Sequence, residues 1–341
     1  MTASGLGAVV PQPDALYRAV EEAAGRRVAR TAWSEARRSA REFGNVLRKL
    51  PVKCDVAESA FVVNARTPED VAELRREQAA RKAVGVDAPW LAPPAVQADI
   101  ATDSFGALRL RDAFTFDPVR ATLGLVSAAE AKGARIFEQS AVRRTRFTRR
   151  IAQVQLSAGG VRTPAIIVAT GEPGSVFGQL RRHVRREIGY AIVTHPLLAP
   201  MRHASGKRTS VVTDAGPAPY WWRWLSEDRV LFAGARSRPP GPRLRDKFVV
   251  QRTAQLMYEL SVRYPAISGL PAAWGWDVPV VSTPDGLPWI GPHRNYPFHF
   301  FALAFGWHGD GLAWLAARAA VRFVRGEATR DDDAFGFVRY L

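Results

Sequence analysis

The chain has 341 residues, enough for two modest domains or one large one, and 47% of them are apolar and 23% charged. These fractions are close to those of globular proteins and exclude a largely disordered chain. Its single cysteine, Cys54, excludes an internal disulfide and indicates a reducing compartment. The longest apolar stretch, 311–324, contains two arginines, and the first residues lack the pattern of a secretory signal. We therefore predict a cytoplasmic protein without a membrane partner.

The formal net charge of +16 comes almost entirely from arginine. A strongly basic chain is typical of proteins that contact nucleic acids or anionic membranes. The densest groups, within 143–150 and 181–186, lack the interleaved aromatic residues of RNA-binding surfaces. The pattern favours a solvated surface, which would help to attract an anionic cofactor or substrate, over a nucleic-acid site.

Two helices are predicted at the start of the chain. Asp14 is placed to cap a helix over 15–24, which Gly25 ends. A longer helix over 27–50 follows, because its apolar residues recur three or four positions apart.

The next predicted elements lie between residues 54 and 138. A helix over 117–132 is capped by Asp117 and ended by Gly133, and a short buried strand over 134–138 follows it. A helix, a glycine and a buried strand form half of a crossover unit in a parallel sheet. The earlier elements are a strand over 54–64, a helix capped by Thr67 and opened by Pro68, a turn at Pro93-Pro94, and an exposed strand over 107–111.

Further along, the pattern predicts a hairpin, a group of strands around one helix, and a glycine-rich end. The hairpin has strands over 151–156 and 162–168 about Gly159-Gly160, and its second strand continues into Ala169-Thr170-Gly171. The later elements are strands over 191–195, 208–213, 220–225, 230–233 and 298–304, and helices over 246–264 and 312–325, the last stopped by Gly326.

Two interleaved domains follow from this order of elements. A parallel α/β domain takes residues 1–45, 115–175 and 283–341. An antiparallel-sheet domain takes 46–114 and 176–282. The fold class is α/β, or α+β for the chain as a whole.

The strongest local signal is the glycine cluster Gly306-Trp307-His308-Gly309-Asp310-Gly311, which connects a strand directly to a helix. Glycines let a backbone approach a ligand closely, and a helix start offers free N–H groups and positive potential to an anion. A tight turn without a ligand is the alternative. Three glycines exceed what such a turn requires, so a binding role is favoured.

Four motifs taken together resemble the D-amino-acid oxidase, glycine oxidase and sarcosine oxidase family of FAD-dependent oxidoreductases. They are Gly133–Glu138 with Ser140-Ala141-Val142, VATG ending at Gly171, DGLPWIGP from Asp285, and GWHGDGLAW from Gly306. Their order and spacing fit the family over nearly the whole chain. The resemblance implies an FAD-binding Rossmann-like domain and an interleaved antiparallel substrate domain.

The resemblance also implies a set of cofactor-binding residues. Val142 would contact the adenine end of FAD through its backbone, and Thr170 and Gly171 would line the cofactor. Residues 2–5 resemble the loop that follows the family's second strand beside the flavin. The residues expected at the flavin ring are therefore Ser4, Gly5, Gly306, Gly309, Asp310 and Gly311.

The chain departs from the family in its nucleotide-binding motif. The family opens with a strand, a G-x-G-x-x-G turn, a helix and a strand ending in an acidic residue, and the 341 residues contain no G-x-G-x-x-G. The expectation is an N-terminally incomplete nucleotide-binding sheet, from a misplaced start codon, a truncated gene or a piece supplied elsewhere. Tight FAD binding would suffer, because the pyrophosphate donors would be absent.

The substrate side offers two candidates, Arg223 and His308. Family members that oxidise amino acids bind the carboxylate through an arginine, whose fork matches it in two parallel bonds. In the glycine-oxidase-like branch this arginine lies a few residues before the Asp-Gly turn, but residues 278–282 contain no arginine. Arg223, within an aromatic run, either replaces it or is part of the sheet packing. His308 either polarises the flavin or packs, since hydride transfer needs orientation more than a strong base. The histidines lack metal-ligand spacing, so no metal is predicted.

The predicted function is FAD-dependent oxidation of a C–N bond in a small amine or amino acid, with no nucleic-acid partner. The alternative is a truncated, non-catalytic relative that does not bind FAD, or a basic binding protein.

Overall fold

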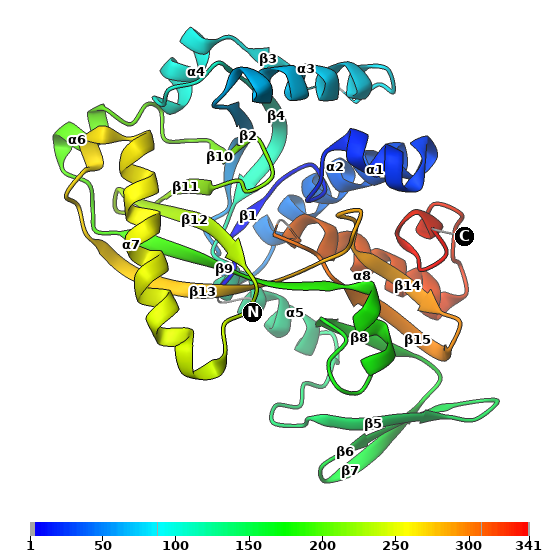
Figure 1. Ribbon diagram of the computed structural model, residues 1–341. Helices are drawn as coiled ribbons and strands as arrows, with labels where there is room; N and C mark the ends of the chain where they lie inside the picture. Colours follow the sequence, from blue (N-terminus) through cyan, green and yellow to red (C-terminus); the bar gives the residue numbers. More distant parts are fainter. Residues whose placement is uncertain (1–3, 87, 308, 340–341) are drawn as a thin grey trace. The chain divides into compact units, whose positions relative to one another are not determined.

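The computed structural model describes residues 4–86, 88–307 and 309–339, and it divides into two compact units (Figure 1). The large-sheet unit consists of Met1–Pro11, Asp55–Pro118 and Arg186–Val280. The small-sheet unit consists of Gln12–Cys54, Val119–Arg185 and Val281–Leu341. Within the described part of the chain, no helix is both long and apolar enough to cross a membrane.

The large-sheet unit is built on a nine-stranded sheet in the order β1-β4-β2-β10-β11-β12-β9-β13, with β3 paired to β4. β2 and β10 are parallel, whereas β10, β11, β12 and β9 pair antiparallel in succession. The strands are β1 Ala8–Val9, β2 Ala57–Ala65, β3 Trp90–Leu91, β4 Gly106–Thr115, β9 Arg185–Thr194, β10 Val211–Asp214, β11 Trp221–Leu225, β12 Arg229–Ser237 and β13 Ala272–Ser282. The helices are α3 Pro68–Lys82, α4 Pro93–Ile100, α6 Ala199–His203 and α7 Arg245–Arg263, with 3₁₀ turns Pro242–Leu244 and Pro265–Ile267.

The core of this unit lies between one face of the sheet and α7. Leu256 and Leu260 of the helix are fully buried with Trp222 and Phe232 of the sheet. Tyr264, just after the helix, accepts a hydrogen bond from Trp222 Nε1 (3.0 Å) and donates one to Ile100 O (2.8 Å). A buried tyrosine hydroxyl with both partners costs little to desolvate, so Tyr264 adds a satisfied polar group to an apolar core.

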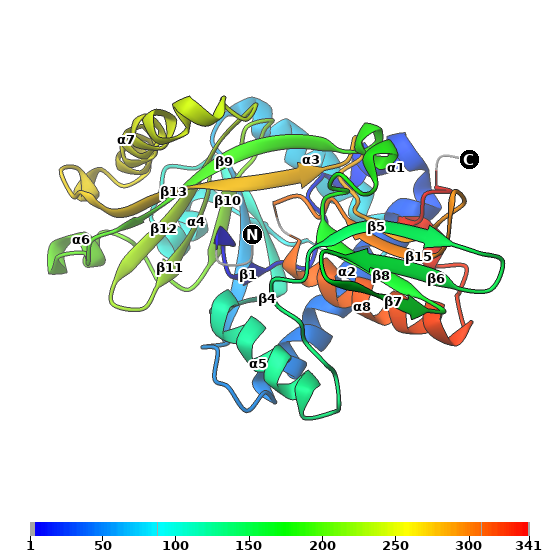
Figure 2. The ribbon, with the colours of Figure 1, turned by 90° about the horizontal axis from the view of Figure 1, so that it is seen from below.

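The small-sheet unit contains two three-stranded sheets (Figure 2). One has the order β14-β15-β8, with β15 and β8 parallel, and the other is the antiparallel meander β5-β6-β7. The strands are β5 Val142–Phe147, β6 Ala152–Leu156, β7 Gly159–Thr163, β8 Ile166–Gly171, β14 Trp289–His293 and β15 Tyr296–Leu303. The helices are α1 Tyr17–Ala24, α2 Arg26–Arg48, α5 Pro118–Glu130 and α8 Asp310–Arg325, with 3₁₀ turns Gly178–His183 and Asp332–Phe335.

Several expected elements are present where the local signals placed them. Thr67 accepts the Asp70 N–H (3.1 Å) while the Asp70 side chain accepts the Thr67 N–H (3.0 Å), a complete capping box at the start of α3. Gly326 ends α8 in the left-handed conformation.

Other expectations are wrong, two for tertiary reasons and one for a local reason. Residues 134–138 form no strand, and Ile136 and Phe137 are 48% and 66% exposed, because no described strand lies alongside them. Residues 107–111, expected to be exposed, belong to β4, which is flanked by β1, β2 and β3 and is largely buried. Pro93 opens α4 rather than a turn, since proline fits the first helical turn.

Two further boundaries differ from the predicted ones. The expected second hairpin strand breaks around Pro164, which lacks an N–H for a ladder, and β7 and β8 belong to different sheets. Residues 4–11, expected in the same domain as 12–45, belong to the large-sheet unit, in which β1 pairs with β4.

Candidate functional site

The carboxyl ends of two parallel strands form the base of the candidate site. β8 and β15 end together, with Leu303 opposite Gly171, and the Ala304 N–H donates to Gly171 O (2.8 Å). In α/β sheets, ligands bind beyond the carboxyl ends of parallel strands. The structure therefore brings the predicted residues Thr170 and Gly171 to the start of the glycine-rich segment. We call residues 170–171, 304–307 and 309–311 the cradle.

The backbone of the cradle is bent and held at defined points. Ala304 and Gly306 have φ of 60° and 70°, in the left-handed region. The Gly306 N–H donates to Val281 O (2.8 Å), and the Trp307 N–H donates to the Asp14 carboxylate (3.0 Å). These two hydrogen bonds fix the backbone at Gly306 and Trp307, shortly before α8 begins.

The start of α8 supplies donors. Gly309 is the N-cap without a side-chain cap, and its carbonyl accepts the Ala313 N–H (3.0 Å). The N–H groups of a first helical turn have no acceptor inside the helix, and the helix dipole adds positive potential there. A Cβ on Gly309 would overlap Phe305, so the close packing requires glycine. The start of α8 is thus suited to hold an anionic group.

The Asp285-Gly286 turn is held from the far end of the chain. The Asp285 carboxylate takes two bonds from Arg339, at 2.7 and 2.9 Å, and both side chains are fully buried. The guanidinium also lies 3.6 Å from the centre of the Trp289 ring and donates to Leu287 O and Pro288 O. Nothing in the sequence around Arg339 signals this role, because the turn that it binds lies about fifty residues away.

Asp14 is the second residue whose role the sequence concealed. It was expected to cap the first helix, but α1 begins at Tyr17 with Leu16 as N-cap, and that cap makes no side-chain hydrogen bond. Instead, Asp14 bonds to Trp307, 293 positions along the chain. The sequence around Asp14 therefore does not reveal its contact with Trp307.

The remaining predicted residues lie outside the cradle. Ser4 and Gly5 belong to the large-sheet unit, where Ser4 O accepts a bond from Trp276 Nε1 (3.4 Å). Val142 opens β5 in the meander and is 43% exposed. His308 lies outside the described residues.

Arg223 is buried in the large-sheet unit and is engaged by backbone. Its Nε donates to Leu6 O (2.6 Å) and its Nη2 to Phe116 O (3.3 Å). These contacts favour a structural role that joins the segment before β1 to the end of β4. Binding of a substrate carboxylate by Arg223 stays a prediction.

A group of aromatic and histidine side chains lies beside the Asp285 turn. His183 and His293 contact each other and Phe337, with ring centres 4.9–6.2 Å apart. Burial lowers the pKa of both imidazoles, with Arg182 lowering that of His183 further and His183 that of His293. Among the described residues, no three His, Cys, Asp or Glu side chains are grouped so that they could hold a metal ion.

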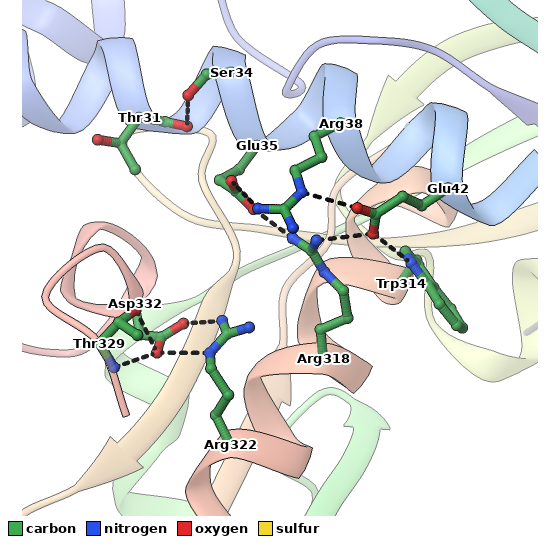
Figure 3. A network of polar contacts seen from close by, with 10 residues as sticks. All are labelled: Thr31, Ser34, Glu35, Arg38, Glu42, Trp314, Arg318, Arg322, Thr329 and Asp332. Atoms are coloured by element: carbon green, nitrogen blue, oxygen red, sulfur yellow. Dashed lines mark hydrogen bonds and ion pairs between the residues drawn. The ribbon is translucent and has the colours of Figure 1, made fainter. Parts of the chain in front are cut away.

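A charged network joins side chains of α2 and α8 (Figure 3). It borders a cavity of about 190 Å³. Arg318 pairs with Glu35 and with Glu42 (2.8 Å), Glu42 also accepts the Trp314 indole N–H (3.1 Å), and Arg322 pairs with Asp332. The arginines bordering this cavity are paired with carboxylates, so the cavity is not a free anion site. Its members join the two helices and the C-terminal turn.

The sequence of the chain matches a family model and a curated relative. A family model described as "FAD dependent oxidoreductase" matches residues 7–322. A probable oxidoreductase, OrdL, from Haemophilus influenzae is 23% identical over 293 residues, covering 83% of this chain and 65% of the relative. The chain thus spans about two thirds of the length of that curated relative.

Solved structures give the same picture of the fold. Glycine oxidase from Geobacillus kaustophilus matches with a TM-score of 0.78 and 18% identity, covering 100% of this chain and 89% of that one. L-Amino acid deaminase from Proteus myxofaciens, in complex with anthranilate, matches at 0.76 with 12% identity over 100% and 85% of the two chains. L-Proline dehydrogenase from P. horikoshii matches at 0.73 with 15% identity over 91% and 83%.

Proposed function

Because this chain belongs to the family of FAD-dependent oxidoreductases, we propose that it oxidises a C–N bond of a small amine or amino acid with FAD as the hydride acceptor. The small-sheet unit is the FAD-binding domain, and the large-sheet unit is the substrate domain. One observation carries the proposal: the ends of β8 and β15 and the start of α8 meet in the cradle.

The residues of the cradle fit the flavin end of the cofactor. The first-turn N–H groups of α8 would face the pyrimidine side of the ring, where negative charge collects on reduction, and would hold it by electrostatics. Gly306 and Gly309 let the backbone of the cradle pack closely against Asp14 and Phe305, because a Cβ at either position would overlap those residues. Thr170 and Gly171 would form the neighbouring wall.

The proposal assigns hydrogen-bond donors to the flavin end of FAD alone. The 341 residues contain no G-x-G-x-x-G turn, so the proposal assigns no donor to the pyrophosphate. When bound, FAD supplies the hydride-accepting centre, and the protein contributes orientation and charge. Amino acids are the favoured substrates, because glycine oxidase, L-proline dehydrogenase and L-amino acid deaminase share the fold.

The test is titration of the purified chain with FAD, followed by anaerobic addition of amines and amino acids. The proposal predicts saturable quenching of flavin fluorescence and bleaching of the flavin absorbance by a substrate. A folded protein that leaves the fluorescence of FAD unchanged across the titration would contradict it.

A second candidate function is supported by the meander. Its sheet and turns carry six exposed arginines, for which the described residues provide no ion-pair partner: Arg143, Arg144, Arg146, Arg149, Arg150 and Arg162. Unpaired surface arginines suit a polyanion, and the alternative is therefore a basic binding protein that lacks flavin. Salt-sensitive retention on DNA, together with absent FAD binding, would favour this alternative.

A further inference from the structure

The segment Asp14-Ala15 lies between the two glycine turns of the candidate site. On one side, a Cβ on Gly306 would overlap the Asp14 carboxylate. On the other, a Cβ on Gly286 would lie 2.5 Å from the Ala15 Cβ. Both glycines also have φ near +70°, where other residues are strained. Two adjacent residues therefore set the spacing of turns that are twenty positions apart in sequence.

Asp14 contacts the cradle through a hydrogen bond to one backbone N–H. Its Oδ2 accepts the Trp307 N–H at 3.0 Å, immediately after the left-handed Gly306. A carboxylate acceptor makes a stronger hydrogen bond to a backbone N–H than a neutral acceptor does. This bond stabilises a bend that the backbone would otherwise leave readily, because glycine has many competing conformations.

We propose that Asp14 is a positioning residue for the cradle, a role that rests on the proposed function. It acts through Trp307 and Gly306 by holding the backbone bent, so that the donors at the start of α8 keep their direction before the cofactor arrives. A preorganised site binds more tightly because less ordering has to accompany binding. Asp14 itself takes no part in the chemistry.

The first arm of the test uses flavin-free protein and measures hydrogen exchange of the Trp307 amide. Asp14→Ala should accelerate that exchange about 10- to 100-fold, the equivalent of a lost charge-assisted bond. Asp14→Asn, which keeps an acceptor oxygen, should retain most of the protection. Glu22→Ala, on the exposed face of α1, is the matched control and should match the wild type. Equal exchange in Asp14→Ala and the wild type would overturn the proposal.

The second arm measures FAD affinity in the same variants. Asp14→Ala should raise the Kd for FAD about tenfold, and Asp14→Asn should raise it less, with Glu22→Ala unchanged. If the wild type binds no FAD, the proposed function fails, whereas the exchange arm still decides the position of Asp14. Equal FAD affinity in Asp14→Ala and the wild type would contradict the proposal that Asp14 positions the cradle for FAD.

A double-mutant cycle keeps the proposal testable if Asp14→Ala is poorly folded. Gly306→Ala should destabilise the wild type through both strain and overlap with Asp14. In the background of Asp14→Gly, which removes the Cβ, Cγ and carboxylate that a Cβ on Gly306 would overlap, Gly306→Ala should cost less. A cost for Gly306→Ala that is the same in both backgrounds would show that the contact with Asp14 has no influence.

Discussion

Each unit has a buried arginine–carboxylate pair between residues far apart in the chain, and the two pairs have different surroundings. In the large-sheet unit, Arg263 of α7 pairs with Asp214 at the end of β10 and lies 4.6 Å from the Tyr220 ring centre. In the small-sheet unit, Arg339 pairs with Asp285 and lies against Trp289. The first pair joins a helix to the sheet that it covers. The second joins the C-terminal segment to a turn next to the cradle.

The difference shows where stability and function should separate. Arg263 is surrounded by core, so its loss should weaken one unit without changing a binding site. Arg339 holds residues 285–288, and Gly286 of that turn packs on Ala15, the neighbour of Asp14. Disturbing Arg339 should therefore affect both stability and the cofactor.

The largest effect is expected for Arg339→Ala. It leaves the Asp285 carboxylate buried without its cation, which typically costs about 3–5 kcal/mol. We expect a loss of that order in the free energy of urea unfolding, together with weaker FAD binding. An unchanged FAD affinity in the folded variant would contradict the different roles of Arg339 and Arg263, because the turn would then be independent of the cradle.

Arg263→Ala should cost less, about 3 kcal/mol, at the lower end of the same range. Burial already raises the pKa of the Asp214 carboxyl, so the carboxyl can take up a proton when its partner is removed. FAD affinity should stay at the wild-type value. Calorimetry and fluorescence titration on the same preparation measure both quantities, and a parallel loss of FAD affinity would count against separate roles.

A smaller effect is expected for Arg318→Ala in the network of Figure 3. Arg318 bonds to Glu35 and Glu42 between α2 and α8, but the network is partly open to water and is therefore partly screened. We expect a loss of about 1–2 kcal/mol in chemical denaturation. Arg41→Ala, an exposed position on α2, is the control and should change stability by less than about 0.5 kcal/mol.

The smallest effect should come from pH. The lowered pKa values of His183 and His293 mean that the folded state binds fewer protons than the unfolded state near their ordinary pKa of 6.5. Stability should therefore fall as the pH decreases through that value and is fully present above it. The double variant His183→Gln/His293→Gln should flatten the dependence between about pH 5 and 7. An unaltered slope in equilibrium unfolding would refute the assignment.

Much of the local structure could be predicted from the residues, because its causes are local. The Thr67 capping box and the Gly326 stop depend on neighbours within a few positions. The strand β15 and helix α8 around the cradle follow from hydrophobic periodicity and glycine placement.

What could not be predicted depends on partners far apart in the chain. The bond from Trp307 to Asp14 spans 293 positions, that from Arg223 to Leu6 spans 217, and that from Arg339 to Asp285 spans 54. Residues 134–138 carry a strand pattern, but a strand forms only beside another strand. Pattern reasoning identifies a residue with a role and leaves its partner open.

The most direct test of the account is hydrogen exchange of the whole chain with and without FAD. We expect FAD to slow exchange at the amides of Asp310, Gly311 and Leu312 and around Gly171, and to leave exchange in α3 and α7 unchanged. Protection elsewhere, with the start of α8 exchanging as fast as in the free protein, would contradict the assignment of the cradle to the flavin.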